Sequence, residues 1–373
     1  MTIKYKFLQI FVTHIMAFIT LSLGGLWTWA VVAYFLVFGP LYALFDDDDT
    51  SNPDEDRYKE ISELKFYRYV TYLFVPFHLG LILYGFHLIG QPGLATYEYI
   101  GVILSIGITG SAAIIVAHEL IHRREKLERV LGGILLSTVS YATFKVEHTR
   151  GHHVTVSTPE DASSARYGQS FYHFLPRAMI RNPINGFKLE AKRLARKGLS
   201  AWSFENELIK WTLLTLALAL IGWLAAGFYG VVYFVLQSAI AIALLELVNY
   251  VEHYGLERRK LPNGRYERVT PLHSWNSSKH ISNILMLNLQ RHSDHHANPM
   301  RRYQALRHFD ESPQLPHGYG TMVLVALVPP LWFSMMNPLA KEAMNNIRQG
   351  FEIKSDEEAD VNLLMDPEVA KQA

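Results

Sequence analysis

The stretch that decides the fold is YIGVILSIGITGSAAIIVAHELIH, residues 99–122. No charged residue occurs from Tyr99 to Ala117, and a helix needs about 20 apolar residues to cross a bilayer core. The stretch then ends in the motif HELIH. Residues four apart lie on one face of a helix, so His118 and His122 present two imidazoles to one point. The sequence therefore predicts a membrane span whose end carries metal ligands.

The composition of the 373-residue chain also favours a membrane protein. Half of the residues are hydrophobic and 18% are charged, against about 25% charged in ordinary soluble domains. The net charge of +1 creates no global field for a nucleic acid, so we expect no nucleic-acid partner. Because the chain contains no cysteine, disulfides, iron–sulfur clusters and Cys-ligated zinc are excluded.

Six apolar stretches predict an all-α, polytopic membrane fold. The six spans are expected at residues 7–23, 26–45, 69–89, 99–121, 211–228 and 231–250. Short glycine-containing links join the first two and the last two into antiparallel hairpins. The apolar segment 130–144 is too short for a span, which favours a buried or re-entrant helix. The segment 322–336 is interrupted by two prolines and is expected at the membrane interface.

The positions of Lys and Arg predict the orientation. None of the 35 lies between the first and second, the third and fourth, or the fifth and sixth spans. Because cytoplasmic loops carry the excess of Lys and Arg, both termini and all long loops are expected in the cytoplasm. Residues 1–345 then form one membrane domain, with a cytoplasmic helical cap built from 122–207 and 251–320. The acidic run 46–49 is expected to be a solvated loop, and 346–373 an acidic mobile tail.

Nine of the 17 histidines form three clusters and one outlier, His253, all on the cytoplasmic side in this orientation. They are His118, His122, His148, His152, His153, His253, His292, His295 and His296. Spacing of four predicts that His148 shares a helix face with His152. Nine imidazoles exceed what one tetrahedral ion can use but fit two metals with open positions. The same spacing pairs His292 with His296, and His295 is expected to reach toward a second metal.

Carboxylates accompany the histidine clusters. They are Glu119, Glu147, Glu252 and Asp294. Such groups commonly hold the second nitrogen of a metal-binding imidazole, and we expect them, together with His273, to support the ligands. Two other interpretations remain open. The HELIH motif also matches the H-E-x-x-H pattern of zinc proteases, and a membrane protein with cytoplasmic histidines can be a non-enzymatic metal transporter.

With these residues in place, the sequence resembles the membrane-bound alkane 1-monooxygenases, which are integral-membrane non-haem diiron hydroxylases with histidine boxes. The resemblance extends to about Trp332, and its most specific part is 289–297. Histidine boxes also admit fatty-acyl desaturases and alkyl-aromatic methyl hydroxylases of the xylene type. Arg123 follows the first box where many family members have lysine.

The resemblance implies that an alkane, O2 and two electrons give a primary alcohol and water. It implies that the nine histidines bind two iron ions, without haem or flavin in this chain. The electrons would come from rubredoxin, reduced by a separate NAD(P)H-dependent reductase. The lack of cysteine fits a donor supplied by another protein. The implied location is the bacterial inner membrane, with an alkane dissolved in the lipid bilayer as substrate; a homo-oligomer is compatible with the sequence.

Two further sets of residues follow from this scheme. An alkane entering from the lipid between the first four spans is expected to pass Trp27, Trp29, Tyr34, Thr109 and Ser111. An acidic electron carrier is expected to dock on basic residues that follow His122 and His296. These are Arg123, Arg124, Lys126, Arg129, Arg301 and Arg302.

Overall fold

The computed structural model describes residues 4–43 and 45–349, and within these residues the secondary structure is helical, with three isolated β-bridges and no strand. The α-helices are α1 (Val12–Leu23), α2 (Ala30–Ala33), α3 (Gly39–Ala43), α4 (Glu55–Glu63), α5 (Lys65–Ile89), α6 (Thr96–Ile121), α7 (Lys126–Thr138), α8 (Phe144–Glu147), α9 (His153–Thr155), α10 (Phe171–Ala195), α11 (Glu207–His253), α12 (His280–Leu285), α13 (His292–Ala297), α14 (Tyr319–Ala326) and α15 (Pro329–Gln349). The 3-10 helices are η1 (Lys4–Phe11), η2 (Gly25–Trp29), η5 (Pro271–His273) and η6 (Tyr303–Ala305), and the π-helices are η3 (Tyr34–Phe38) and η4 (His148–His152). The predicted all-α class is confirmed. Apart from the end of α15, the tail expected at 346–373 lies outside the described residues.

Four described helices are long and apolar enough to cross a membrane. They are Lys4–Leu23, Asp56–Ile89, Thr96–Ile121 and Glu207–His253. A fifth candidate is the pair α14 and α15, which bends by 119° at a short break next to the two prolines. The second expected span is shorter than predicted, because the apolar helix there covers Gly25–Leu41 and is divided into 3-10, α and π segments. The protein is therefore a multi-pass membrane protein, but the count of six spans is not confirmed.

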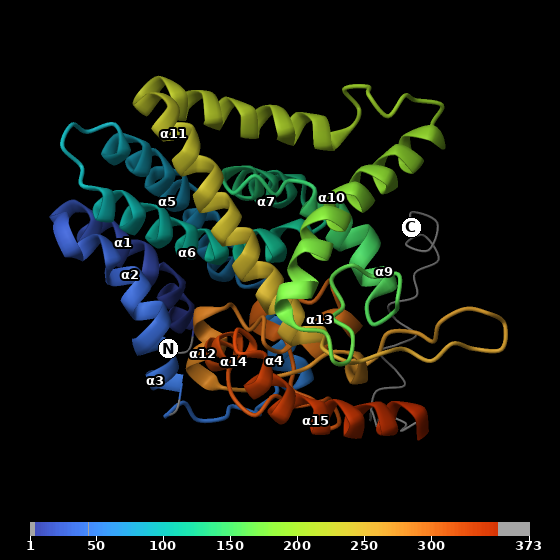
Figure 1. The fold of residues 1–373 in the computed structure, drawn as a ribbon. Coiled ribbons are helices and arrows are strands. Elements are labelled where there is room, and N and C mark those ends of the chain that lie inside the picture. The colour runs from blue at the N-terminus through green and yellow to red at the C-terminus, as the bar shows by residue number, and fades with distance from the viewer. Residues whose placement is uncertain (1–3, 44, 350–373) are drawn as a thin grey trace.

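Helix α11 contains the link that was expected between the last two spans. The break lies at Ala226 and Gly227, where Gly227 has φ 58° and ψ −142°. This left-handed conformation is accessible to glycine at little cost. The chain therefore turns between an arm at 207–225 and an arm at 228–253, and in Figure 1 the second arm runs diagonally across the bundle.

Helix α6 is the central helix of the bundle. It packs against α5, α7 and α11 (Figure 1). Small residues make the approach of α11 possible, because a Cβ on Gly107 would lie 2.7 Å from the Cβ of Ile240 and one on Gly110 would lie 2.9 Å from that of Ala241. Small residues at helix interfaces are typical of membrane bundles. The close contact brings His118 and His253, at the ends of α6 and α11, to the same side of the molecule.

The short apolar segment expected as a buried helix is confirmed as α7. Its residues Leu135 and Leu136 are fully buried, and the helix packs against α6. The acidic run 46–49, expected to be a solvated loop, is solvated at Asp47 and Asp48 but not at Asp46. Asp46 is 4% exposed and accepts hydrogen bonds from the backbone N–H groups of Ile281 (2.8 Å) and Ser282 (3.0 Å) at the start of α12. This link therefore ties the N-terminal helices to the segment that precedes α13.

Candidate metal centre

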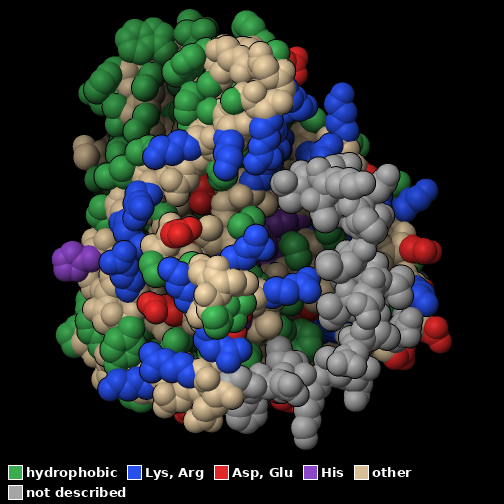
Figure 2. Space-filling model, turned by 90° about the vertical axis from the view of Figure 1, so that its right-hand side faces the viewer, with side chains coloured by type: hydrophobic (Ala, Val, Ile, Leu, Met, Phe, Trp, Pro, Cys, Tyr) green, Lys and Arg blue, Asp and Glu red, His purple; other side chains and the backbone are tan. Residues whose placement is uncertain are grey.

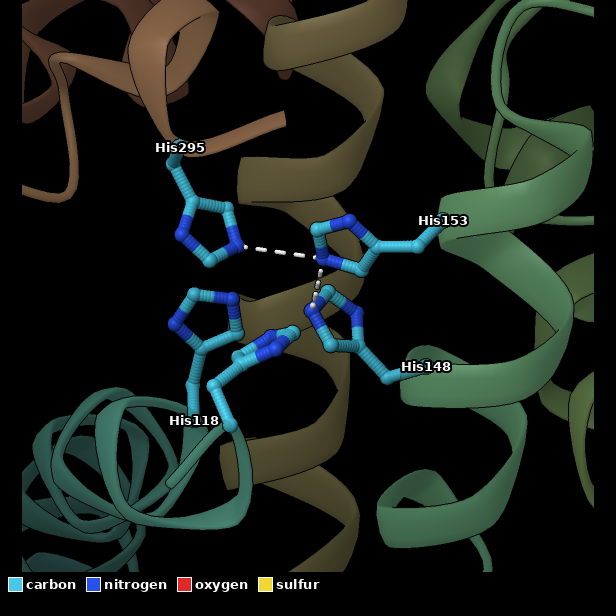
Figure 3. Close-up of side chains that lie close together, drawn as sticks. His118, His148, His153 and His295 are labelled. Carbon is cyan, nitrogen blue, oxygen red and sulfur yellow. Dashed lines mark hydrogen bonds between the residues drawn. The ribbon is translucent and has the colours of Figure 1, made fainter. Parts of the chain in front are cut away.

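All nine cluster histidines converge on one buried region. They come from the end of α6, from η4 and α9, from the end of α11, and from α13. Their ligand atoms form two groups, within each of which all atoms lie within 4.8 Å of one another. The first group holds His118, His122, His148, His153 and His295, and the second holds His152, His253, His292 and His296. Figure 3 shows four members of the first group with their rings turned toward a common point.

The distances within each group are those of ligands that share one ion. The Nε2 atom of His153 lies 3.0 Å from Nε2 of His148 and 3.1 Å from Nε2 of His295. In the second group, Nε2 of His292 lies 3.2 Å from Nε2 of His253. Two imidazole nitrogens that bind one ion at about 2.1 Å lie roughly 3.0–3.4 Å apart in octahedral or tetrahedral geometry. Each group can therefore hold one metal ion.

The helical spacing predicts two of the three pairs. His118 falls with His122, and His292 with His296, as residues four apart on an α-helix do. The expected pairing of His148 with His152 is wrong. Residues 148–152 form a π-helix, in which the N–H of His153 bonds to the C=O of His148, so the position five residues on returns to the same face.

Unsatisfied buried nitrogens support the fit of a metal. Among the described residues, several ring nitrogens have no hydrogen-bond partner although they are inaccessible to solvent. They include Nε2 of His118, His122 and His152 and both ring nitrogens of His296. Leaving such a buried acceptor unpaired costs about 1–3 kcal/mol. Binding to a cation satisfies a neutral imidazole nitrogen and removes this cost.

The electrostatic environment keeps these histidines neutral. Burial, together with the neighbouring histidines, lowers the pKa of His122, His148 and His295 well below the ordinary value of 6.5. Burial likewise lowers the pKa of His153 and His296. Neutral imidazole is the form that binds metals, so the site is ready to bind a metal at neutral pH.

Two carboxylates lie beside histidines of the second group, and one of them, Asp161, forms a hydrogen bond to its histidine. Nδ1 of His152 lies 2.9 Å from Oδ2 of Asp161, and Nδ1 of His292 lies 3.2 Å from Oε1 of Glu252. Asp161 also accepts a hydrogen bond from the hydroxyl of Ser164 at 2.6 Å. Burial alone would raise the pKa of Asp161, but His152 and Ser164 lower it below its ordinary value. Asp161 was not predicted from the sequence; its signal is an acidic pair, Glu160 and Asp161, that follows His152 by eight and nine positions and is followed closely by Ser163 and Ser164.

The other expected supporting residues have different partners. Glu119 pairs with Arg123 at 2.9 Å, and Asp294 accepts from Asn298 at 2.8 Å. His273 lies 3.2 Å from Glu267. Glu147 is buried, and burial together with nearby carboxylates raises its pKa well above the ordinary value. None of these four has a described hydrogen bond to one of the nine clustered histidines.

An apolar cavity of about 90 Å³ lies along α6, and its lining on this helix ends at Ile115, one helical turn before His118. It is lined by residues of η3, α6, α11 and α14, including Phe35, Ser111, Ile115 and Val248. Ser111, Ile115 and His118 follow one another at helical spacing on α6, so the cavity and the histidine share a helix face.

One of the five expected channel residues, Ser111, lines this cavity. The hydroxyl of buried Thr109 bonds to the backbone oxygen of Ile106. Trp27 is exposed, and Trp29 donates to the backbone oxygen of Tyr97. Tyr34 precedes the lining residue Phe35 on η3. The other four residues that were expected along the substrate route do not line this cavity.

The six expected docking residues divide into two sets. Arg124, Lys126 and Arg129 are exposed. Arg123 is 3% exposed and bonds to Glu119 and to the backbone oxygens of Met300 and Arg301. Arg301 and Arg302 pair with the acidic residues Asp294 and Glu128. Arg124, Lys126 and Arg129 are therefore accessible at the surface, whereas Arg123, Arg301 and the half-buried Arg302 hold together the segments around the histidines.

The chain is similar to known proteins along most of its length. A model of the fatty acid desaturase family matches residues 95–325. Alkane 1-monooxygenase 2 of Pseudomonas aeruginosa is 51% identical over 320 residues, which cover 84% of this chain and 84% of that protein. Alkane 1-monooxygenase 2 of Alcanivorax borkumensis is 48% identical over 326 residues, which cover 86% and 85%. The hydroxylase component of xylene/toluene monooxygenase from Pseudomonas putida is 29% identical over 320 residues, which cover 84% and 82%.

Proposed function

Since the chain belongs to the fatty acid desaturase family and to the alkane 1-monooxygenases, we propose that it hydroxylates the terminal methyl group of alkanes to primary alcohols. The observation that carries this proposal is the convergence of nine histidines, eight of them buried, in two groups, together with an apolar cavity that shares a face of α6 with His118. Relatives named alkane 1-monooxygenases at about half identity support the same reaction class.

We propose that the two histidine groups bind two iron ions. Imidazole suits several transition metals, so iron is inferred from the family and not from the ligands alone. When bound, the two irons would supply the activation of O2 and the oxidising power that cleaves an unactivated C–H bond. The chain's own contribution is to hold the imidazoles at fixed positions, with the carboxylate of Asp161 fixing the ring of His152.

An alkane has no polar group for an enzyme to hold, so its position depends on shape alone. The apolar walls around Phe35, Ile115 and Val248 exclude water and suit a hydrocarbon chain. Because Ile115 and His118 lie on the same face of α6, a chain in this cavity can direct its end toward the first histidine group. This arrangement favours attack at a terminal carbon, since the end of the chain enters first.

We propose that the histidine groups face the cytoplasm of a bacterial inner membrane. The distribution of Lys and Arg supports this orientation, and Figure 2 shows a face of the molecule on which many of these side chains gather. Substrate would then come from the lipid and electrons from the aqueous side. With no cysteine in this chain, we assign the one-electron carrier to a separate rubredoxin and its reductase, docking near Arg124, Lys126 and Arg129.

The zinc-protease alternative conflicts with one contact. In the H-E-x-x-H mechanism the glutamate acts as a general base, but Glu119 is buried and paired with the guanidinium of Arg123 at 2.9 Å. A carboxylate held in this way is not available to activate water.

Product analysis tests the proposed function. Membranes that contain the full chain, supplied with an alkane, O2 and reduced rubredoxin, are expected to yield the 1-alkanol by gas chromatography. His152→Ala should abolish the product, and His173→Ala, which changes an exposed histidine of α10, should not. Formation of a double bond in a fatty-acyl substrate would instead assign a desaturase, and benzylic alcohols alone would assign an alkyl-aromatic hydroxylase. If none of these substrates yields an oxidised product, the proposal is contradicted.

A further inference from the structure

A cavity of about 750 Å³ lies outside the two histidine groups. It is bounded by η1, the link at 46–53, helix α4 and the segments on either side of α13. None of the nine clustered histidines lines it. The proposed hydroxylation therefore does not use this cavity.

Positive charge is in surplus around this cavity. Four cationic side chains line it, those of Lys4, Lys6, Arg57 and Arg291, against the two carboxylates of Asp49 and Glu60. Asp49 is already engaged, because its Oδ1 accepts from the hydroxyl of Ser51 at 2.5 Å and its Oδ2 lies 3.3 Å from Nδ1 of His280.

Three of the four cationic side chains, those of Lys4, Lys6 and Arg57, form the rim of the cavity and have no acidic partner at ion-pair distance among the described residues. Cations that face one cavity repel one another, and an anion between them removes this repulsion. The rim is thus arranged for a negatively charged occupant.

Arg291 is a buried cation on the wall of the cavity. Its side chain is 6% exposed and donates only to backbone carbonyls, to Leu306 O at 2.7 Å, Ser51 O at 3.2 Å and Asp49 O at 2.6 Å. The nearest described carboxylate oxygen, Oδ1 of Asp49, is 3.9 Å away, and Nε has no hydrogen-bond partner. Burying a charge is costly unless it is paired, so an anion in the cavity would stabilise this guanidinium.

The apolar lining of the cavity and its position at the start of two candidate spans indicate which kind of molecule supplies the anion. Apolar side chains, among them Phe7, Leu64 and Tyr67, form part of the wall. The candidate spans Lys4–Leu23 and Asp56–Ile89 both begin at this cavity, which places it at the surface of the bilayer. Apolar walls do not stabilise a free inorganic anion, whereas they can contact the carbon atoms that adjoin the phosphate of a phospholipid.

We propose that this cavity binds the phosphate of an anionic membrane phospholipid. Lys6, Arg57 and Arg291 surround the phosphate, and the apolar wall contacts the carbon atoms beside it. Arginine and lysine are the residues that recognise phosphate. Because Arg291 directly precedes His292, the bound lipid also fixes the segment that enters α13.

Lipid binding can be measured without any hydroxylation assay. The full-length protein in detergent is titrated with short-chain phosphatidylglycerol, and the bound lipid is counted by native mass spectrometry. One tightly bound lipid is expected, with phosphatidylcholine binding more weakly. Each Lys or Arg near an anionic lipid contributes roughly fivefold in affinity, so Lys6→Gln combined with Arg57→Gln should weaken binding roughly 25-fold. Both side chains are free of ion pairs, and an unchanged iron content verifies the fold of this variant.

A matched control changes the same charge elsewhere. Lys188→Gln combined with Arg196→Gln alters an exposed residue of α10 and the exposed residue directly after this helix, and should leave the affinity unchanged. Equal binding of phosphatidylcholine, or equal affinity in the cavity variant, overturns the proposal. Displacement of the lipid by inorganic phosphate at the same concentration overturns the lipid source and assigns the cavity to soluble phosphate. These lipid-binding measurements do not depend on hydroxylation, so they can still be interpreted if the proposed hydroxylation is not found.

Discussion

The Nε2 atoms of His148 and His153 lie 3.0 Å apart although the residues are five positions apart in the sequence. The π-helix at 148–152 produces this contact and sends His152 to the other histidine group. A regular α-helix would have paired His148 with His152 and left His153 at its side. One irregular turn therefore divides three neighbouring histidines between two metal positions.

The division into two groups predicts the effect of single substitutions on metal content. Purified protein should contain about two irons per chain. His118→Ala removes a ligand from the first group and His253→Ala removes one from the second, so each should leave about one iron. Elemental analysis by mass spectrometry measures this, with His173→Ala as the control that keeps two. One zinc per chain together with peptidase activity would contradict the assignment and favour a protease.

Asp161 is predicted to strengthen metal binding through His152. Removal of a carboxylate that holds a ligand imidazole typically costs 10–100-fold in metal affinity. Asp161→Ala should therefore release iron to a competing chelator at roughly 10–100-fold lower chelator concentration, and Asp161→Asn, which keeps an acceptor for Nδ1–H, should lose less. Glu160→Gln, at the exposed neighbouring position, is the matched control. Equal iron release from Asp161→Ala and the control would falsify this role.

The sequence predicts the histidine pairs that depend on regular helix geometry, and no more than these. His118/His122 and His292/His296 follow from the spacing of four. The π-turn after His148 has no comparable sequence signal, because it depends on how the short segment between α8 and α9 packs in the folded protein. Asp161 was missed for the same reason, since its contact with His152 is made by a loop.

Hydropathy predicts apolar length but not continuity. The all-α membrane fold, the buried helix α7 and the bend between α14 and α15 agree with the sequence analysis. The span expected at 26–45 does not, because Gly24 and Gly25 have φ of 66° and 57° and the following helix changes type three times before Leu41. Sequence composition also placed Arg123 at the surface, although carbonyl groups of Met300 and Arg301, far along the chain, enclose it.

The apolar cavity is predicted to set the range of alkane lengths. Val248→Phe adds volume to a wall of a cavity of about 90 Å³, so product formation should shift toward shorter alkanes while iron content stays at the wild-type value. Leu216→Phe, on the exposed surface of the first arm of α11, is the control. Competition assays with alkanes of graded length measure the shift, and an unchanged profile would place the substrate elsewhere.

The basic residues after α6 are predicted to have two separable roles. Arg123→Ala leaves the carboxylate of Glu119 buried and unpaired, which should destabilise the protein by about 3–5 kcal/mol. Arg124→Glu combined with Lys126→Glu should keep stability and iron but raise the KM for rubredoxin by roughly tenfold or more at low salt. Donor titrations at increasing ionic strength test this. If the curves match those of the wild type, these residues serve only to orient the protein in the membrane.

Membrane topology is predicted by the same charge distribution. A reporter inserted at Gly93, in the loop between α5 and α6, should be periplasmic, and one at Lys197, between α10 and α11, should be cytoplasmic. Gly230 is unsuitable, because it lies within α11 and packs against the backbone of Gly222. A periplasmic signal at Lys197 would place the segment that carries His148, His152 and His153 on the opposite side of the membrane from the one expected.

The order of the histidines along the chain has a consequence for how the protein is made. The four candidate spans are complete once His253 has been synthesised, but the last four helices, including α13, follow it. A ribosome adds about 5–20 residues per second, so the chain inserts in the membrane seconds before His292, His295 and His296 exist. Metal binding to a site of this kind is coupled to folding. A metal ion that needs the ligands of α13 can therefore be bound only after this segment has been translated, and a chain that stops before it would be inserted in the membrane without His292, His295 and His296.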